Sequence, residues 1–202
     1  MSRKVAILIF NDVEVLDFCG PFEVFGTAGA GQSGEKPFEV FTVAEQAGPV
    51  LARNGLSVNS GYTLENCPQP DILLIPGGAS AAVPMKNEVV LHWIRAQAER
   101  VELLLSVCNG ALVLASAGLL EGLTATTHYL EVERLRAMAP NTTLCPEKRY
   151  VDNGKIVLSA GISAGIDMSL YIVARLLGEE QAANTAAFMQ YDYWHGSIPA
   201  GS

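Results

Sequence analysis

Short, uninterrupted hydrophobic runs alternate with amphipathic stretches along most of the chain. Four runs predict strands: residues 4–10 (KVAILIF), 38–43 (FEVFTV), 71–75 (DILLI) and 102–107 (ELLLSV). Their apolar residues are continuous rather than alternating, which is typical of strands covered on both faces. Between these runs, apolar positions recur at helical spacing, which predicts helices over residues 15–26, 88–101 and 111–120. This order indicates an α/β fold, a flavodoxin-like three-layer sandwich whose mostly parallel central sheet has helices on both faces.

Two segments depart from this alternation. Residues 50–63 carry Asn54-Gly55 between short β-like pieces, and residues 150–159 carry Asn153-Gly154 in the same setting. Asn-Gly between such pieces is a strong local signal for a hairpin turn. We therefore expect both segments to be small antiparallel β-hairpin additions to the main sheet.

The C-terminal part of the chain returns to helical spacing. Residues 165–177 and 179–191 predict two helices, and the aromatic residues 191–195 are interpreted as a packing or dimer-contact segment. Residues 26–34 (GTAGAGQSG) predict a flexible loop, because their glycines lack the GxGxxG spacing and the preceding strand of a dinucleotide site. With neither a linker nor an internal repeat, we expect a single domain over residues 1–202.

Composition and charge narrow the class of protein. Of the 202 residues, 50% are hydrophobic and 17% charged, which favours a globular domain over a disordered chain. The 13 basic and 21 acidic residues give a net charge of −8 and form no basic cluster, so nucleic-acid binding is not expected. No apolar run is long enough to cross a membrane, and the start of the chain resembles no signal peptide. A cytoplasmic protein is therefore expected. The low charge count also predicts no cationic group for phosphates or carboxylates, and hence a small neutral electrophile as substrate.

The cysteines and histidines follow no metal-binding spacing. The chain has 4 cysteines and 3 histidines. They form neither a CxxC pair nor an i,i+4 histidine pair, so we expect no metal site and no cofactor. Reduced thiols in a cytoplasm are the simplest interpretation of this cysteine usage.

Cys108 is the residue with the most chemical information. It lies in the sequence LSVCNGA, where an apolar strand ends and a helix of small residues begins. Such a junction points a side chain out of the C-terminal edge of the sheet, where open α/β folds bind ligands. The helix N-terminus favours the thiolate, and Gly110 suits a cramped turn like a nucleophile elbow. The alternative is a buried cysteine that acts as a small core hydrophobe.

Two further features are expected at the same edge. Gly77 and Gly78 directly follow the strand at residues 71–75, so their backbone N–H groups can approach a ligand and donate to developing negative charge. An ordinary loop is the alternative. Asp17 lies in an apolar setting near the first strand-to-helix connection, where burial would keep it protonated or it would bond the thiolate. The alternative role for Asp17 is a helix cap.

Four sequence blocks together carry a resemblance to a known family. They are VLDFCGPFEVF (15–25), DILLIPGG (71–78), SVCNGALVLASAGLLEGLTATTHY (106–129) and GISAGIDMSLYIVARLLG (161–178). In this order and spacing the chain resembles the ThiJ/PfpI superfamily, which has the class I glutamine amidotransferase-like fold. Within that superfamily it is most similar to the isonitrile hydratase branch and to the ligand-side domains of AraC-type regulators. The resemblance implies a homodimer.

The resemblance to the hydratase branch implies a mechanism. Cys108 would attack the terminal carbon of an isonitrile to form a thioimidate, and water would release an N-substituted formamide. Asp17 would be the general acid and base that exchanges protons with that carbon and with water. Backbone amides at Gly78 and Asn109 would shape the site, and Gly161 and Ile162 would line the pocket.

The sequence also departs from the patterns of the branches. The hydratase branch has threonine after the nucleophile where this chain has Asn109, and the protease-like branch has histidine there. The glyoxalase and deglycase branch usually has glutamate where this chain has Asp17. The regulator-like Thr126-Thr127-His128 is present, but no helix-turn-helix follows it, so direct DNA binding is not expected. Two alternatives to the hydratase remain: an enzyme acting on 2-oxoaldehydes, and a redox or ligand sensor that uses Cys108 without turnover.

A few residues have supporting interpretations. His128 is a candidate hydrogen-bond partner at the site, although a structural histidine is the more common case. Cys19, two residues after Asp17, is a candidate for a disulfide or a redox relay or, more simply, a core thiol. Asp167 and Glu23 are interpreted as members of structural ion pairs.

Overall fold

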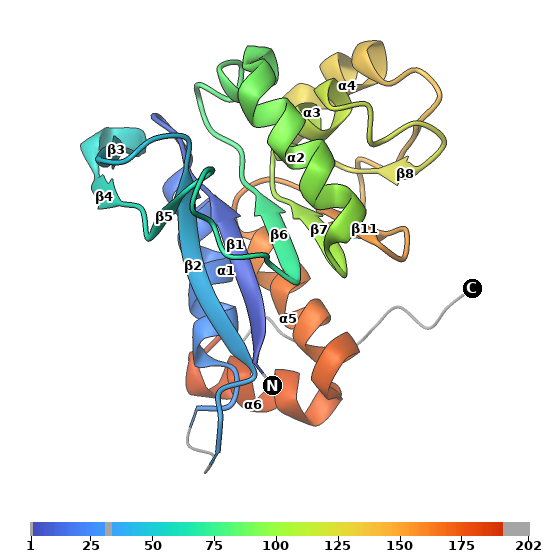
Figure 1. Ribbon diagram of the computed structural model, residues 1–202. Helices are drawn as coiled ribbons and strands as arrows, with labels where there is room; N and C mark the ends of the chain where they lie inside the picture. The colour runs from blue at the N-terminus through green and yellow to red at the C-terminus, as the bar shows by residue number, and fades with distance from the viewer. Residues whose placement is uncertain (1, 31–33, 192–202) are drawn as a thin grey trace.

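A seven-stranded sheet forms the centre of the computed structural model, which describes residues 2–30 and 34–191 (Figure 1). The strand order is β10-β11-β7-β6-β1-β2-β5, and every neighbouring pair is parallel except β10 and β11. The strands of this sheet are β1 (Arg3–Leu8), β2 (Phe38–Ala44), β5 (Tyr62–Thr63), β6 (Ile72–Ile75), β7 (Leu103–Ser106), β10 (Tyr150–Asp152) and β11 (Ile156–Ser159).

Helices cover both faces of this sheet and make three layers (Figure 1). On one face lie α1 (Val15–Thr27), α5 (Ala164–Leu177) and α6 (Glu179–Phe188). On the other lie α2 (Glu88–Arg100), α3 (Gly110–Ser116) and α4 (Val132–Met138). Short 3₁₀ segments are η1 (Arg53–Gly55), η2 (Pro84–Lys86) and η3 (Tyr129–Glu131). The predicted flavodoxin-like α/β sandwich is confirmed.

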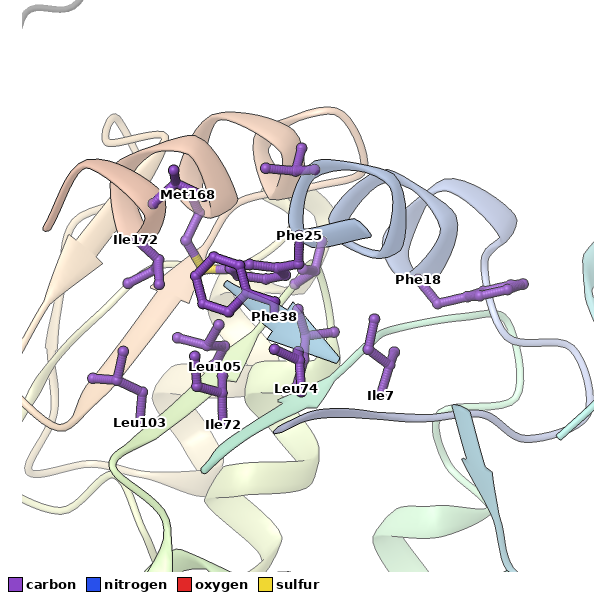
Figure 2. Packing of buried hydrophobic residues seen from close by; sticks show 14 of the residues in the cluster. Ile7, Phe18, Phe25, Phe38, Ile72, Leu74, Leu103, Leu105, Met168 and Ile172 are labelled. Carbon is purple, nitrogen blue, oxygen red and sulfur yellow. The ribbon is translucent and has the colours of Figure 1, made fainter. Parts of the chain in front are cut away.

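The continuous apolar runs are explained by a separate hydrophobic core on each face. In β1, Val5 and Ile7 belong to the core under α1 and α5, whereas Ala6 and Leu8 belong to the core under α2 and α3. Because successive strand residues point to opposite faces, every residue is buried where a strand is covered on both sides, and such a stretch is apolar. Figure 2 shows the first core, where the rings of Phe25 and Phe38 meet edge to face with centroids 5.1 Å apart.

The first predicted hairpin differs from the expectation. Strands β3 (Pro49–Leu51) and β4 (Ser57–Asn59) do pair antiparallel, but they form a sheet of their own outside the main sheet. Strand β5 instead joins the edge of the main sheet, parallel to β2. The turn of the hairpin is η1, in which Asn54 has a φ of 61°, a value that asparagine tolerates better than most residues.

The second predicted hairpin is an integral part of the main sheet. Strand β11 is a parallel partner of β7, and β10 adds to it as the antiparallel edge strand. Residues 124–144, for which the sequence pattern predicts no element, contain α4 and a small parallel pair, β8 (Thr124–Ala125) with β9 (Thr143–Leu144). Helix α3 also ends at Ser116, earlier than predicted, because Gly118 takes a φ of 76° two residues later.

Some interpretations fall on residues outside the described ranges. These are residues 31–33 of the predicted loop and residues 192–195 of the aromatic segment. Helix α6 ends at Phe188, three residues before the predicted end. Among the helices of the described ranges, none has the length and apolar character that a bilayer crossing requires.

Candidate active site

Cys108 lies in the connection between β7 and α3, at the C-terminal edge of the sheet. Its backbone has a φ of 58°, and its N–H donates to the carbonyl oxygen of Ala160 at 3.2 Å. The turn is tight: a Cβ at Gly110 would lie 2.2 Å from the carbonyl oxygen of Ile75, so no larger residue fits there. The sheet edge and this turn therefore fix the position of Cys108, and only 7% of the residue is exposed to solvent.

Asp17 is a fully buried carboxyl in the first turn of α1. Its Oδ2 accepts a hydrogen bond from the backbone N–H of Gly77 at 3.0 Å, whereas Oδ1 has no partner of regular geometry within the described residues. Burial raises its pKa from 3.8 to about 7, the Gly77 N–H opposes this rise, and the nearby negative charge of Glu14 adds to it. Asp17 can therefore both hold and release a proton near neutral pH.

The Asp17 carboxyl and the Cys108 thiol interact directly, and each perturbs the other. Burial and, as a smaller cause, the negative charge of Asp17 together raise the pKa of the Cys108 thiol to about 12. Backbone N–H groups of Asn109 and Ile162 bond the sulfur and act in the opposite direction. The Asn109 N–H at the start of α3 does favour the thiolate, but burial outweighs it, so the predicted low pKa of this thiol is wrong. The sulfur ionises most easily when its proton moves to Asp17, because the negative charge of Asp17, which disfavours a second negative charge on the sulfur, is then removed.

The backbone N–H groups of Gly77 and Gly78 donate to side chains of the protein, whereas the sequence predicts that they donate to a ligand. The Gly77 N–H is bonded to Asp17, and the Gly78 N–H donates to Asn109 Oδ1 at 2.8 Å. Asn109 Nδ2 donates back to the carbonyl oxygen of Gly78 at 3.1 Å. The Asn109 side chain thus ties the two loops together, and both glycine amides already have partners. The backbone amides that face the reactive sulfur are those of Asn109 and Ile162.

The turn after β11 completes the surroundings of the sulfur. Ile162 has a φ of 53°, an unusual conformation for a β-branched residue, and this strain is of a kind that clusters at functional sites. A Cβ at Gly161 would lie 2.3 Å from His128 Cδ2, so the glycine makes room for the imidazole. His128 Nδ1 accepts from the Leu130 N–H at 3.3 Å, and its ring lies 4.6 Å from that of Tyr129. His128 therefore already has a structural role.

A cavity of about 200 Å³ opens above Cys108. Of the predicted site residues, five line this cavity, namely Gly78, Cys108, Asn109, His128 and Ile162. Asp17, Gly77, Gly161 and Cys19 are not among the lining residues. The remaining lining residues are Glu14, Arg53, Ala79, Ala81, Ala82, Leu130, Glu131 and Arg134.

Two arginines at this cavity contradict the expectation that no cationic group is available. Arg53 pairs with Glu14 at 2.8 Å, and Arg134 pairs with Glu131 at 3.5 Å. Neither arginine belongs to the motifs that predict the site. Arg53 is in the turn between β3 and β4, and Arg134 is in the unpredicted helix α4, so only the folded chain brings them together.

The remaining candidates lie away from the cavity. Cys19 lies in α1, half-buried against the core, where burial raises the pKa of its thiol, and all four cysteines are free. Asp167 pairs with Arg149 and accepts from the Tyr191 hydroxyl at 2.8 Å, as expected of a structural ion pair. Glu23 is exposed on α1, and its expected ion pair stays a prediction. Within residues 2–30 and 34–191, no cluster of three histidine, cysteine or acidic side chains is placed to hold a metal.

Comparison with known proteins places this geometry in context. The model of the DJ-1/PfpI family matches residues 3–175. Isonitrile hydratase from Pseudomonas putida is 34% identical over 192 residues, which cover 95% of this chain and 79% of that enzyme. The HTH-type transcriptional regulator CdhR from Pseudomonas aeruginosa is 29% identical, and the chain spans about half (54%) of its length. A crystal structure of a ThiJ/PfpI family protein from Pseudomonas syringae superposes with a TM-score of 0.86 at 27% identity, covering 100% of this chain and 80% of that one.

Proposed function

The chain belongs to the DJ-1/PfpI family, and from this we propose that it is a cysteine-dependent hydratase that converts an isonitrile and water into an N-substituted formamide. One observation carries the proposal. Asp17, a buried carboxyl with a pKa of about 7 and one oxygen without a regular partner, contacts the thiol of Cys108 at the base of the cavity. An acid that titrates near neutral pH beside a nucleophile is the arrangement that hydration of a carbon electrophile requires.

The proposed reaction begins with one proton shared between Asp17 and Cys108. As the proton settles on Asp17, the sulfur becomes a thiolate held by the backbone N–H groups of Asn109 and Ile162. Asp17 gives its proton to the terminal carbon of the isonitrile while Cys108 Sγ bonds to that carbon. This step forms the thioimidate and leaves Asp17 ionised.

The second half of the reaction releases the product. Asp17 accepts one proton from water as the water oxygen bonds to the thioimidate carbon, and passes it to the imine nitrogen. The carbon–sulfur bond then breaks with its electron pair on sulfur, the hydroxyl proton moves to Asp17, and the resulting carbonyl belongs to the formamide. The sum is one isonitrile plus one water giving one formamide, and the pair regains its single proton.

The proposal is tested by product analysis with an isonitrile. We expect the wild-type protein to form the N-substituted formamide from cyclohexyl isonitrile, followed by proton NMR. We expect Cys108→Ala and Asp17→Asn to lose about 10³-fold or more in rate, the scale of covalent and general acid–base catalysis. Cys19→Ala is the matched control and should retain the wild-type rate, because this thiol neither lines the cavity nor, unlike Asp17, is among the groups that act on Cys108. Failure of the wild-type protein to consume a panel of isonitriles would refute the proposal.

A ligand-sensing domain is the second candidate. The regulator CdhR, similar over 92% of this chain, is the observation that favours it. A sensor of this kind would bind a small molecule in the cavity above Cys108 without converting it. It would therefore give saturable binding by calorimetry and no formamide in the same samples.

A further inference from the structure

Charged side chains line the cavity above Cys108 from two parts of the fold. Glu14 and Arg53 come from the start of α1 and the β3–β4 turn, whereas Glu131 and Arg134 come from η3 and α4. Figure 1 shows the β3–β4 pair and α4 on opposite sides of the sheet. Each side thus offers one arginine and one glutamate toward a molecule that reaches the sulfur.

The two arginines are similarly exposed, and they differ in how strongly each is bound to its glutamate. Arg53 Nη1 makes a 2.8 Å bond to Glu14, whose side chain is only 16% exposed. Such a charge-assisted bond to a largely buried carboxylate is strong. The charge of Arg53 is therefore the better compensated of the two.

Arg134 is held only weakly. Its Nη1 lies 3.5 Å from Glu131 Oε2, and its Nη2 lies 3.8 Å from Met85 Sδ. Ion pairs three residues apart on an exposed helix contribute little, and thioether sulfur is a weak acceptor. With its side chain 46% exposed at the cavity, Arg134 keeps most of its five N–H donors for a ligand.

We propose that Arg134 is a specificity-determining residue that binds a carboxylate group of the substrate. This inference rests on the proposed function and adds to it: the reacting isonitrile carbon is uncharged, whereas the substituent on its nitrogen carries the negative charge. The planar guanidinium fork matches a carboxylate in two parallel hydrogen bonds. A cavity of about 200 Å³ limits the substituent to a small one, such as the acid portion of an isocyano acid.

The first test compares two isonitriles that differ in one charge, isocyanoacetate and methyl isocyanoacetate. The wild-type protein should show a higher kcat/KM for the acid. Arg134→Gln should lower the acid-to-ester ratio of kcat/KM about tenfold, the effect of losing a hydrogen-bonded charge pair. Glu131→Gln should raise the ratio, since it removes a like charge and frees Arg134.

The chain provides a matched control for this substitution. Arg136 pairs with Glu133 at 3.3 Å in the same i,i+3 arrangement on α4, but it is not among the residues that line the cavity. Arg136→Gln removes the same type of ion pair from the same helix, so it should leave the ratio unchanged. Equal ratios for Arg134→Gln, Arg136→Gln and the wild-type protein would overturn the inference.

A second assay separates failure of this inference from failure of the proposed function. Cys108 is alkylated by iodoacetate and by neutral iodoacetamide, and intact-protein mass spectrometry gives both rates. Arg134→Gln should lower the iodoacetate-to-iodoacetamide rate ratio, and added salt should lower it in the wild-type protein only. If isonitriles are not hydrated but this ratio falls as stated, the hydratase proposal fails and anion binding by Arg134 stands. If isonitriles are hydrated and neither ratio responds to Arg134→Gln, only the role of Arg134 fails.

Discussion

Two buried aspartates occupy matching places on the same face of the sheet and have opposite surroundings. Asp17 and Asp167 both lie in the first turn of a helix, α1 and α5 respectively, and both are nearly inaccessible. Asp167 is paired with Arg149 and accepts from the Tyr191 hydroxyl. Asp17 has one backbone N–H, no countercharge among the described residues, and a thiol beside it.

The difference shows how surroundings separate a structural carboxyl from a chemical one. A buried carboxylate with a cation and a hydroxyl beside it is stabilised in its charged form, whereas one without a cation resists ionisation. An ionised Asp17 therefore destabilises the folded protein, because no cation beside it offsets the loss of hydration, whereas Arg149 does so at Asp167. Uncompensated burial of this kind is common where a catalytic acid must titrate near neutral pH.

The largest expected contrast between the two aspartates is in activity. Asp17→Asn should lower isonitrile hydration about 10³-fold, because the acid and base of the reaction is lost. Asp167→Asn should leave kcat within about threefold, because this side chain neither lines the cavity nor, unlike Asp17, acts on Cys108. The measurement is initial rate at saturating isonitrile for both variants. Comparable losses in the two would contradict the distinction.

The second contrast is in stability and its dependence on pH. The pKa of Asp17 is about 7 in the folded protein against an ordinary 3.8, so the folded state holds this proton more tightly. The free energy of unfolding therefore falls as pH rises from about 4 to about 7. Integrated over that shift, the cost is up to about 4 kcal/mol above pH 7.

Asp17→Asn should remove this cost. The variant should be more stable than the wild-type protein at pH 8, and the difference should vanish near pH 4. Urea denaturation at the two pH values measures both free energies of unfolding. A variant that is equally destabilised at both would show that Asp17 is a structural carboxyl after all.

A smaller effect is expected from breaking the compensated pair. Asp167→Ala removes the partner of Arg149 and of the Tyr191 hydroxyl, which should cost about 1–3 kcal/mol of stability, since the Arg149 side chain is half exposed and regains water. Asp152→Ala is a control on the same side of the fold, where Asp152 binds Arg175 and Tyr171 near the surface. Asp152→Ala should lower the free energy of unfolding less than Asp167→Ala does. A larger loss for Asp152→Ala in urea denaturation would count against the structural role of the Asp167 pair.

The smallest effect is expected at Glu14. Its charge raises the pKa of Asp17, but it is a lesser cause than burial. Glu14→Gln should therefore shift the midpoint of the pH–activity profile toward lower pH, by less than about one pH unit. Glu88→Gln, at an exposed position on α2 far along the chain, is the control and should leave the pH profile unchanged. A shift toward higher pH would contradict the stated sign.

The sequence predicts the parts of this site that depend on local pattern. Continuous apolar runs indicate which strands are covered on both faces, and the junction after residues 102–107 places Cys108 at the sheet edge. Asp17 stands out because a carboxyl lies among apolar neighbours. The burial of both side chains in the structure agrees with those patterns.

Hydrogen-bond partners far apart in the chain are not visible in such patterns. The Gly77 amide is used by Asp17, 60 positions earlier, and the Gly78 amide by Asn109, 31 positions later. The sequence pattern does not predict the short helix α4, because Leu135 is its one buried residue and leaves almost no periodic signal. Without α4, Arg134 could not be placed at the cavity.

The central claim is that Asp17 and Cys108 act as one proton-sharing pair. The pH dependence of Cys108 alkylation by iodoacetamide tests it directly, in the wild-type protein and in Asp17→Asn. With pKa values of about 7 and about 12, the wild-type rate should rise through pH 7 to a plateau and rise again in strong alkali. Asp17→Asn should show a single rise without the step near pH 7. Identical single-step profiles in the two proteins would contradict the account.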